Sequence, residues 1–314
     1  MRAETADVYR RRRLTALALV VGVAVLAIVA VGSCGSSDRP AAAKRERRRP
    51  LVVDLPRGKR RIFPDFRVVA FYGAPQDDQL GVLGIGSAAL AARKLLRQAA
   101  PYARRTRPVL PAMELIASVA ANAPGPDGLY RTQQAPKVIN RYLRVARRIK
   151  ALLVLDIQPG HADFLSEARR LAPWLGQPDV GIALDPEWHT PGAVPGTQIG
   201  TVTADEINQV SDVVAGIVRA GRLPEKLFLI HQFTDGMIQG KDRVLPRAGL
   251  AITFNVDGFG DRPNKLAKYA EFTAQSRGRP FDDGYKLFYH EDTNLMRPAD
   301  VMRMHPRPDL IVYE

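Results

Sequence analysis

The chain of 314 residues contains only one cysteine, Cys34, together with five histidines and two tryptophans. A single thiol excludes a disulfide framework within the chain. The sequence also lacks the GxSxG motif of serine hydrolases, and the glycines at 81–86 do not have the GxGxxG spacing of a dinucleotide-binding loop. These absences argue against a disulfide-stapled domain, a serine hydrolase and a doubly wound sheet with a Gly-rich phosphate-binding loop.

The positive charge is unevenly distributed along the chain. The formal net charge is +14, yet residues 1–66 hold 15 Lys and Arg against 6 Asp and Glu, while the remaining 248 residues hold 31 against 26. Most of the excess therefore belongs to an amino-terminal segment and not to a folded surface. This distribution argues against a basic groove for nucleic acid.

The amino-terminal end has the pattern of an export signal. Four arginines at positions 10–13 precede an apolar run at 14–32, which Ser33 and Cys34 follow. The run is also long enough to cross a bilayer, which takes ~20 apolar residues. Val31-Gly32-Ser33-Cys34 resembles the lipobox of bacterial lipoproteins, and this resemblance implies lipidation of Cys34. We expect residues 1–34 to be either a lipoprotein signal or an uncleaved anchor, with the bulk on the extracytoplasmic face of the cell membrane.

A linker follows this segment. Residues 35–65 are rich in Ser, Ala, Pro and basic residues, and they lack periodic apolar positions. This composition is typical of a disordered, solvated tether. Contact of its basic residues with anionic lipid head groups or an acidic wall polymer is the alternative.

From residue 66 to residue 314, strand-like and helix-like segments alternate. Eight strand-like runs are expected at 67–73, 108–117, 151–158, 180–187, 227–233, 250–257, 286–291 and 310–314. Helical patterns separate them at 87–99, 138–150, 161–171, 203–220, 235–241, 265–275 and 299–304. Eight such repeats in about 250 residues predict an α/β fold, a (β/α)₈ TIM-type barrel whose last helix is missing. An open doubly wound sheet is the alternative.

The fourth strand is the stretch around which we place a functional site. In the run from Val180 to Trp188, Ile182 and Leu184 would face one side, while Asp185 and Glu187 would face the other. Period-two alternation also points polar residues inward at the carboxyl ends of other strands, where barrels of this kind hold their sites. These residues are Tyr72, Glu114, Asp156, Gln158, Asn255, Asp257 and Tyr313. Strands five and seven are ambiguous, and His231 or Gln232, and His290 or Glu291, would point inward.

Carboxylates and aromatic rings at one rim are the composition of a carbohydrate site. The acids would bind hydroxyl groups or catalyse, and the rings of Tyr72, Trp188 and Tyr313 would stack on sugar faces. Structural roles remain open for several of these residues. Asp156 could cap a helix and Glu114 could form an ion pair. The histidines could be satisfied structural residues, and Asn255 with Asp257 could hold a turn.

The pattern resembles two types of glycoside-hydrolase barrel. Chitinase-like barrels end their fourth strand in DxxDxDxE, in which the last Glu is the general acid. Asp185-Pro186-Glu187 matches the final D-x-E, and Ala183 stands where the middle acid would be. Retaining glycosidases place an acid on strand four and a nucleophile on strand seven, which would be Glu187 and Glu291. The chain also resembles uncharacterised exported or lipoprotein-type proteins of actinobacteria, a resemblance that implies no activity.

We therefore hypothesise that Glu187 donates a proton to a glycosidic oxygen. Neighbouring Asp185 would raise its pKa by like-charge repulsion, and the second carboxylate would be Glu291, Asp257 or Asp156. The expected partner is a carbohydrate or cell-wall polymer, and no cofactor or metal is expected. The competing class is a non-catalytic glycan-binding or structural envelope lipoprotein. A metal-dependent hydrolase using the acids with a histidine lacks the paired His-x-His expected at the end of strand one.

Overall fold

The computed structural model describes residues 53–314. The predicted signal or anchor at 1–34, including Cys34, and most of the linker lie outside the described residues. Among the described helices, none combines the length and apolar character that crossing a membrane requires.

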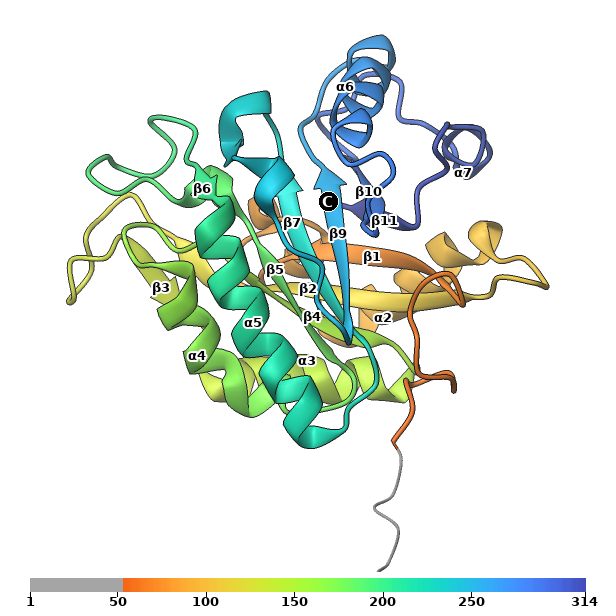
Figure 1. Ribbon diagram of the computed structural model, residues 1–314, viewed down its shortest axis with the longest axis horizontal. Helices are drawn as coiled ribbons and strands as arrows, with labels where there is room; N and C mark the ends of the chain where they lie inside the picture. Colours follow the sequence, from red (N-terminus) through yellow and green to blue (C-terminus); the bar gives the residue numbers. More distant parts are fainter. Residues whose placement is uncertain (1–52) are drawn as a thin grey trace, which may run out of the picture. The chain divides into compact units, whose positions relative to one another are not determined.

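Eight parallel strands close into a barrel (Figure 1). Each strand pairs with the next one of the barrel, and β1 pairs with both β2 and the last strand, β11, so no edge is left open. The barrel strands are β1 (Arg67–Gly73), β2 (Val109–Ala120), β4 (Leu152–Ile157), β5 (Val180–Leu184), β7 (Lys226–Gln232), β9 (Leu250–Val256), β10 (Asp282–Leu287) and β11 (Leu310–Tyr313). This closure confirms the predicted (β/α)₈ class and excludes the open sheet.

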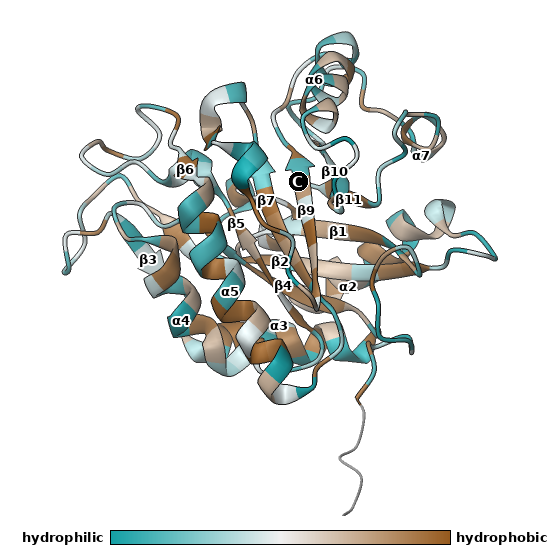
Figure 2. Ribbon diagram, viewed as in Figure 1, coloured by the Kyte–Doolittle hydropathy of each residue, from teal (hydrophilic) through white to brown (hydrophobic). Residues whose placement is uncertain are grey.

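Helices cover the outside of the barrel, and α2, α4, α5 and α6 each begin after a residue whose side chain caps the helix. Thr203 and Glu206 form a capping box at the start of α5, as their spacing predicts. Figure 2 shows apolar residues along the strands and polar residues on the outer helix faces. The helices are α2 (Ala88–Ala99), α3 (Pro136–Arg148), α4 (Phe164–Leu175), α5 (Ala204–Gly221), α6 (Arg262–Ala274) and α7 (Pro298–Val301). Within the described chain, short 3-10 turns at Asp235–Met237 and Lys241–Arg243 replace the helix between β7 and β9.

Three short strands lie outside the barrel. β3 (Arg131–Gln133) pairs antiparallel with the end of β2, so the loop after β2 folds back as a hairpin. β6 (Val202–Thr203) and β8 (Ile238–Gln239) form a two-stranded parallel sheet beside the loops that follow β5 and β7. These additions brace loops at the carboxyl ends of the strands.

The two faces of each barrel strand carry different side chains. On β4, Leu153, Leu155 and Ile157 belong to the core between the barrel and its helices. Val154 belongs instead to the core inside the barrel, and Asp156 alternates with it on the same inner face. The outer apolar face docks the helices, which leaves the upper inner face available for polar residues.

The amino-terminal end of the barrel is closed by a segment that composition assigned to the linker. Ile62 and Phe66 are buried in the inner core, and Leu55 is 3% exposed. The Glu225 carboxylate accepts a hydrogen bond from the Ile62 backbone N–H at 2.5 Å. Residues 55–65 therefore pack as part of the barrel, because their few apolar side chains are buried at the amino-terminal end of its interior.

The seventh strand starts four residues earlier than predicted. β10 comprises Asp282–Leu287, whereas the alternation of 286–291 predicts a strand there. Gly284 lies against Asn255 on β9, where a Cβ atom would come within 2.7 Å of the Asn255 Oδ1. This close approach sets the register, and it moves His290 and Glu291 off the strand into the following loop.

Candidate functional site

A cavity of about 220 Å³ lies at the carboxyl ends of the barrel strands. Its aromatic wall consists of Tyr72, Trp188, Phe233, Phe259 and Phe288. Its ionisable lining groups are Asp185, Glu187, Asp257, Lys286 and Glu314. The loops at 122–135 and 191–200 contribute no lining residue to this part of the described structure, so neither loop plugs the mouth.

The Asp185–Glu187 pair is positioned by a tight turn at the end of β5. The Asp185 N–H still donates to the Ile157 carbonyl at 3.0 Å, and the chain then enters a 3-10 turn over Pro186–Trp188. Gly200 packs beneath this turn, where a Cβ atom would come within 2.4 Å of the Pro186 carbonyl oxygen. Asp185 is 2% exposed, while Glu187 is only partly buried and lines the cavity.

Glu187 has the protonation behaviour of a general acid. Burial raises its pKa to about 8, with further increases from the negative charges of Asp185 and Asp257, while Lys286 opposes the shift. A carboxyl group with this pKa carries its proton at neutral pH. It can therefore donate that proton to a ligand in the cavity.

Beneath the cavity, the Tyr72 hydroxyl joins two buried acids. It lies 3.3 Å from the Asp156 Oδ2 and 3.3 Å from the Asp185 Oδ2, and it accepts a hydrogen bond from the Gln158 Nε2 at 2.9 Å. Burial, followed by the charge of Asp185, raises the pKa of Asp156 well above its ordinary value. One proton on Asp156 lets two acids share one hydroxyl without repelling each other.

His231 bridges two further acids. Its Nδ1 lies 2.7 Å from the Asp257 Oδ2, and its Nε2 lies 3.0 Å from the Glu114 Oε1. Burial lowers the pKa of His231, but the hydrogen bonds to the two carboxylates outweigh it and raise the pKa well above the ordinary value. The ring is thus an imidazolium held between two carboxylates. Asn255 is also buried here, with its Nδ2 3.4 Å from the His231 Nδ1.

Lys286 supplies the second buried positive charge. Its Nζ lies 3.1 Å from the Asp257 Oδ2, 2.7 Å from the Glu314 Oε2 and 3.9 Å from the centre of the Tyr72 ring. Burial opposes ionisation of Asp257, yet Lys286 and His231 hold its pKa well below the usual range. The cavity therefore contains one carboxyl group kept protonated, Glu187, and one kept ionised, Asp257.

Three buried side chains in the barrel have the geometry of a metal site. Ligand atoms of Glu114, Asp156 and His231 all lie within 4.8 Å of one another. The same residues form a buried hydrogen-bonded network under the cavity, in which the His231 Nε2 contacts Glu114 and its Nδ1 contacts Asp257.

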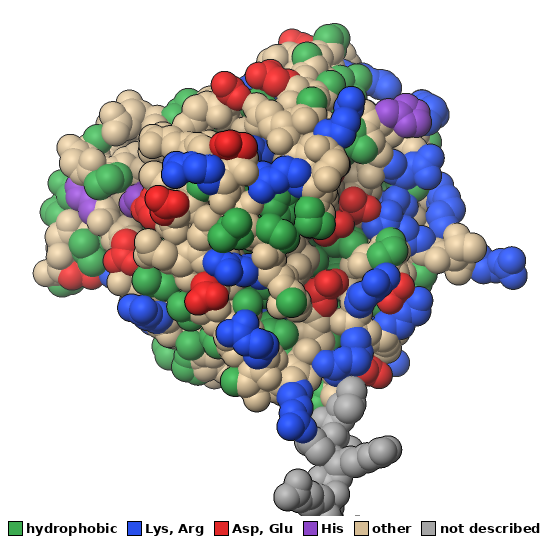
Figure 3. Space-filling model, in the orientation of Figure 1, with side chains coloured by type: hydrophobic (Ala, Val, Ile, Leu, Met, Phe, Trp, Pro, Cys, Tyr) green, Lys and Arg blue, Asp and Glu red, His purple; other side chains and the backbone are tan. Residues whose placement is uncertain are grey.

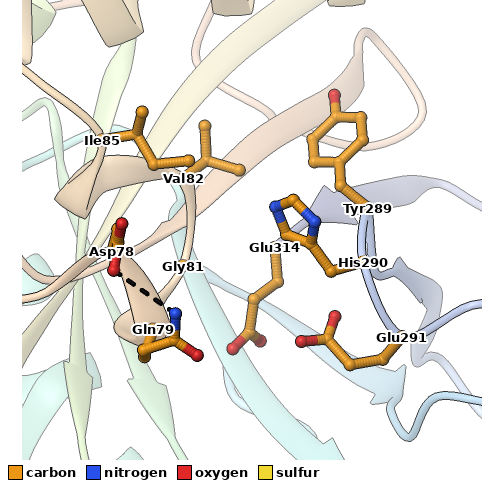
Figure 4. Close-up of a pocket in the computed structure, with 9 residues that line it drawn as sticks. All are labelled: Asp78, Gln79, Gly81, Val82, Ile85, Tyr289, His290, Glu291 and Glu314. Atoms are coloured by element: carbon orange, nitrogen blue, oxygen red, sulfur yellow. Dashed lines mark hydrogen bonds between the residues drawn. The ribbon is translucent and has the colours of Figure 1, made fainter.

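Three of the expected site residues lie elsewhere. Tyr313 faces the helices, because β11 points Leu310 and Val312 inward; its hydroxyl lies 2.6 Å from that of Tyr102. His290 and Glu291 are exposed in the loop after β10. They border a second cavity of about 210 Å³ rather than the first one (Figure 4).

Two charged residues of the cavity were missed by the sequence interpretation. Lys286 was assigned to the start of a strand, although Gly284 and Lys286 share the inner face once the strand starts at Asp282. Glu314 continues the alternation of Leu310 and Val312, which face the barrel interior. The sequence interpretation chose the other face of β11 and so missed Glu314. The three phenylalanines lie in loops or just past strands, where periodicity gives no signal.

Fold and site together define an eight-stranded (β/α) barrel with an acidic, aromatic-walled pocket at the carboxyl ends of its strands. No protein-family model and no curated protein sequence matches the chain. The structure is similar to that of a xylanase and alpha-amylase inhibitor protein from Scadoxus multiflorus, with 12% identity and a TM-score of 0.47 over 79% of this chain and 92% of that chain. It is also similar to a Bacillus subtilis mannanase, with 12% identity and a TM-score of 0.41 over 79% of this chain and 80% of that chain. At these scores we assign the barrel from its strand pairing alone.

Proposed function

We propose that the protein is a glycoside hydrolase in which Glu187 is the general acid. The observation that supports this most directly is the place of Glu187, which lines an aromatic-walled cavity together with Asp185 and Asp257, where burial raises its pKa to about 8. Trp188, Phe233 and Phe259 offer flat apolar surfaces for sugar rings, and the surrounding acids offer acceptors for hydroxyl groups.

In this mechanism, protonated Glu187 transfers its proton to the glycosidic oxygen as the bond to the anomeric carbon breaks. Positive charge develops on the sugar ring, and a water molecule then adds to the anomeric carbon and gives its proton to a carboxylate of the cavity, which completes the hydrolysis. Ionised Asp257 and buried Asp185 stabilise that charge, because both line the same cavity. Lys286 and His231 hold Asp257 in place and keep it ionised.

The proposal includes an extracytoplasmic, membrane-anchored location. It is supported by the arginines at 10–13, the apolar run at 14–32 and the lipobox-like end at Cys34. The described chain enters the barrel at its amino-terminal end, opposite the cavity, which suits a tethered enzyme acting on an envelope or environmental glycan. Membrane fractionation of wild type and Cys34→Ala tests this: release of the variant supports lipidation, and a membrane-bound variant supports an uncleaved anchor. Recovery of wild type in the soluble fraction contradicts both.

Activity is tested on the full-length protein with a panel of bacterial wall and capsular polysaccharides, measured as release of reducing sugar. We expect Glu187→Gln to lower the rate by about 10²–10⁴-fold, the contribution of a general acid. Glu271→Gln, an exposed change of the same chemistry on α6, serves as the matched control. Equal rates for Glu187→Gln and Glu271→Gln contradict the assignment of Glu187.

A glycan-binding protein without turnover is the second candidate. It is favoured by one observation: Lys286 holds both Asp257 and Glu314, so the acids facing Glu187 are already paired. Under this alternative, wild type and Glu187→Gln bind glycan equally and neither releases reducing sugar from any polymer of the panel.

A further inference from the structure

Under the cavity, three ionisable side chains converge on one point from three separate strands. Glu114 lies on β2, Asp156 on β4 and His231 on β7, and each of them is at most 1% exposed. One ligand atom from each lies within 4.8 Å of the other two. In Figure 3, the Lys and Arg side chains on the face in view are interspersed with acids and reach the solvent. The three buried groups have no such contact with water, so their charges must be balanced inside the barrel.

Two carboxylate oxygens of this group have no hydrogen-bond partner in the described structure. Glu114 contacts the His231 Nε2 through its Oε1 at 3.0 Å, while its Oε2 is unpartnered. The Asp156 Oδ1 is also unpartnered and lies 3.9 Å from the same Nε2, which is too far for a hydrogen bond. A buried carboxylate oxygen without a donor or a cation costs free energy. Both oxygens therefore point to a positively charged ligand beside the Nε2 of His231.

The distances among these atoms suit a transition-metal ion. Zn²⁺ binds imidazole nitrogen and carboxylate oxygen at about 2.0–2.2 Å, which places the ligand atoms of a tetrahedral site about 3.4 Å apart. The distances of 3.0 and 3.9 Å from the His231 Nε2 to Glu114 and Asp156 lie on either side of this value. If Glu114 binds through both of its oxygens, the three residues supply four donor atoms.

Two of the three residues already have the outer partners that metal ligands usually carry. The His231 Nδ1 lies 2.7 Å from the Asp257 Oδ2, so it keeps its hydrogen and leaves the Nε2 for a metal. The Tyr72 hydroxyl lies 3.3 Å from the Asp156 Oδ2, which leaves the Oδ1 for the ion. When a metal binds, the proton on the Nε2 and any proton on Asp156 pass to the solvent. Two carboxylates and a neutral imidazole then balance the charge of a divalent ion.

We propose that Glu114, Asp156 and His231 bind one divalent transition-metal ion of the Zn²⁺ type beneath the cavity. None of the three is among the residues that line the cavity, so the ion stabilises the barrel interior and positions Asp257 through the His231 ring. The imidazole ligand favours such an ion over Mg²⁺ and Ca²⁺, which prefer oxygen. This inference goes beyond the hydrolase proposal and does not depend on it.

The test uses the full-length protein with Cys34→Ser, which removes its only thiol, after a chelator has removed bound metals. Isothermal titration calorimetry with Zn²⁺ should show one site per chain that Glu114→Gln and His231→Gln abolish or weaken by more than about 100-fold. Asp257→Asn, which removes the partner of the Nδ1, should weaken it by about 10–100-fold. Glu167→Gln is the matched control, because it removes a buried acid from a separate ion-pair network, and it should leave the Zn²⁺ affinity unchanged.

A second measurement needs no variant of the site. Anomalous scattering at the zinc edge, from crystals soaked in Zn²⁺, should show a peak between the His231 Nε2 and the carboxylates of Glu114 and Asp156. A peak elsewhere only, or no peak, overturns the inference even if the variants fail to fold. Equal Zn²⁺ affinity in Glu114→Gln, His231→Gln and Glu167→Gln also overturns it. So does binding of Mg²⁺ or Ca²⁺ as tight as that of Zn²⁺, because the imidazole would then not be a ligand.

Discussion

The two ends of the barrel use the same eight strands for opposite purposes. At the lower end the inward residues are apolar, and Leu55, Ile62 and Phe66 close the opening. At the upper end the inward residues are acids, a histidine and a lysine, most of them less than 7% exposed. The outward residues of the strands are apolar and pack against the helices, so this packing stabilises the barrel whether its interior is apolar or charged. The network at the upper end therefore depends on pH and on charge pairing, while the apolar closure by Leu55, Ile62 and Phe66 depends on packed volume.

Removing Lys286 should have the largest effect on stability. Lys286→Met leaves Asp257, Glu314 and Asp185 without their ammonium, and breaking a buried pair costs about 3–5 kcal/mol. The loss should shrink as the pH falls, since the carboxyl groups of the variant take up protons in the folded state. Denaturant unfolding at pH 5, 7 and 8 measures this, with exposed Lys137→Met as control. A loss that is the same at all three values contradicts the electrostatic origin.

The lower end should respond to a mutation without this pH dependence. Leu55→Ala removes a side chain that is 3% exposed, and we expect a loss of about 2–3 kcal/mol from the free energy of unfolding. The same unfolding series should give one value at pH 5 and pH 8. A negligible loss would show that residues 55–65 do not close the barrel in solution.

Glu187→Gln should stabilise the protein while lowering its hydrolytic rate. The pKa of Glu187 is about 8 in the folded state against an ordinary value of 4.5, so the folded protein keeps a proton that the unfolded chain has released. Stability is therefore fully present below about pH 4.5 and lost as the pH rises toward 8. After allowance for partial exposure, we expect a gain of about 1–3 kcal/mol at pH 7 and none near pH 4. A variant that is less stable than wild type at pH 7 would show that the pKa of the Glu187 carboxyl group is not raised.

Tyr72→Phe should have the smallest effect of the four. It removes the hydroxyl between Asp156 and Asp185 and leaves the Gln158 amide without that acceptor, at a cost of about 1–2 kcal/mol. Thermal melts at pH 7 measure the loss. If the variant matches wild type, the two acids are held apart by their surroundings and not by the hydroxyl.

Much of the barrel could be predicted because its signals are local. The outward triplet Leu153, Leu155 and Ile157 predicts β4, and the Thr203–Glu206 spacing predicts the start of α5. Asp185 and Glu187 could be placed together because one strand and its turn carry both. Alternation also indicated the inner face at Tyr72, Glu114 and Asn255, which the structure places in the buried network.

The residues that could not be predicted depend on register between strands. The sequence at 282–291 is compatible with more than one position of the strand and more than one choice of inner face. In the structure Gly284 lies against Asn255, and this pairing turns Lys286 inward. Tyr313 and Glu314 differ by one position, and a one-residue shift exchanges inner and outer faces. The phenylalanines at the mouth were missed because loops carry no period.

The sequence by itself determined the number of barrel strands, the acidic end of β5 and the basic amino-terminal segment, because each depends on residues that are contiguous in the chain. Only the tertiary structure decided which charges meet: Lys286 with Asp257 and Glu314, and His231 between Asp257 and Glu114. The physical reason is the closure of the barrel. It brings residues from distant strands into one space with little water, where each charge must find an opposite charge or hold a proton.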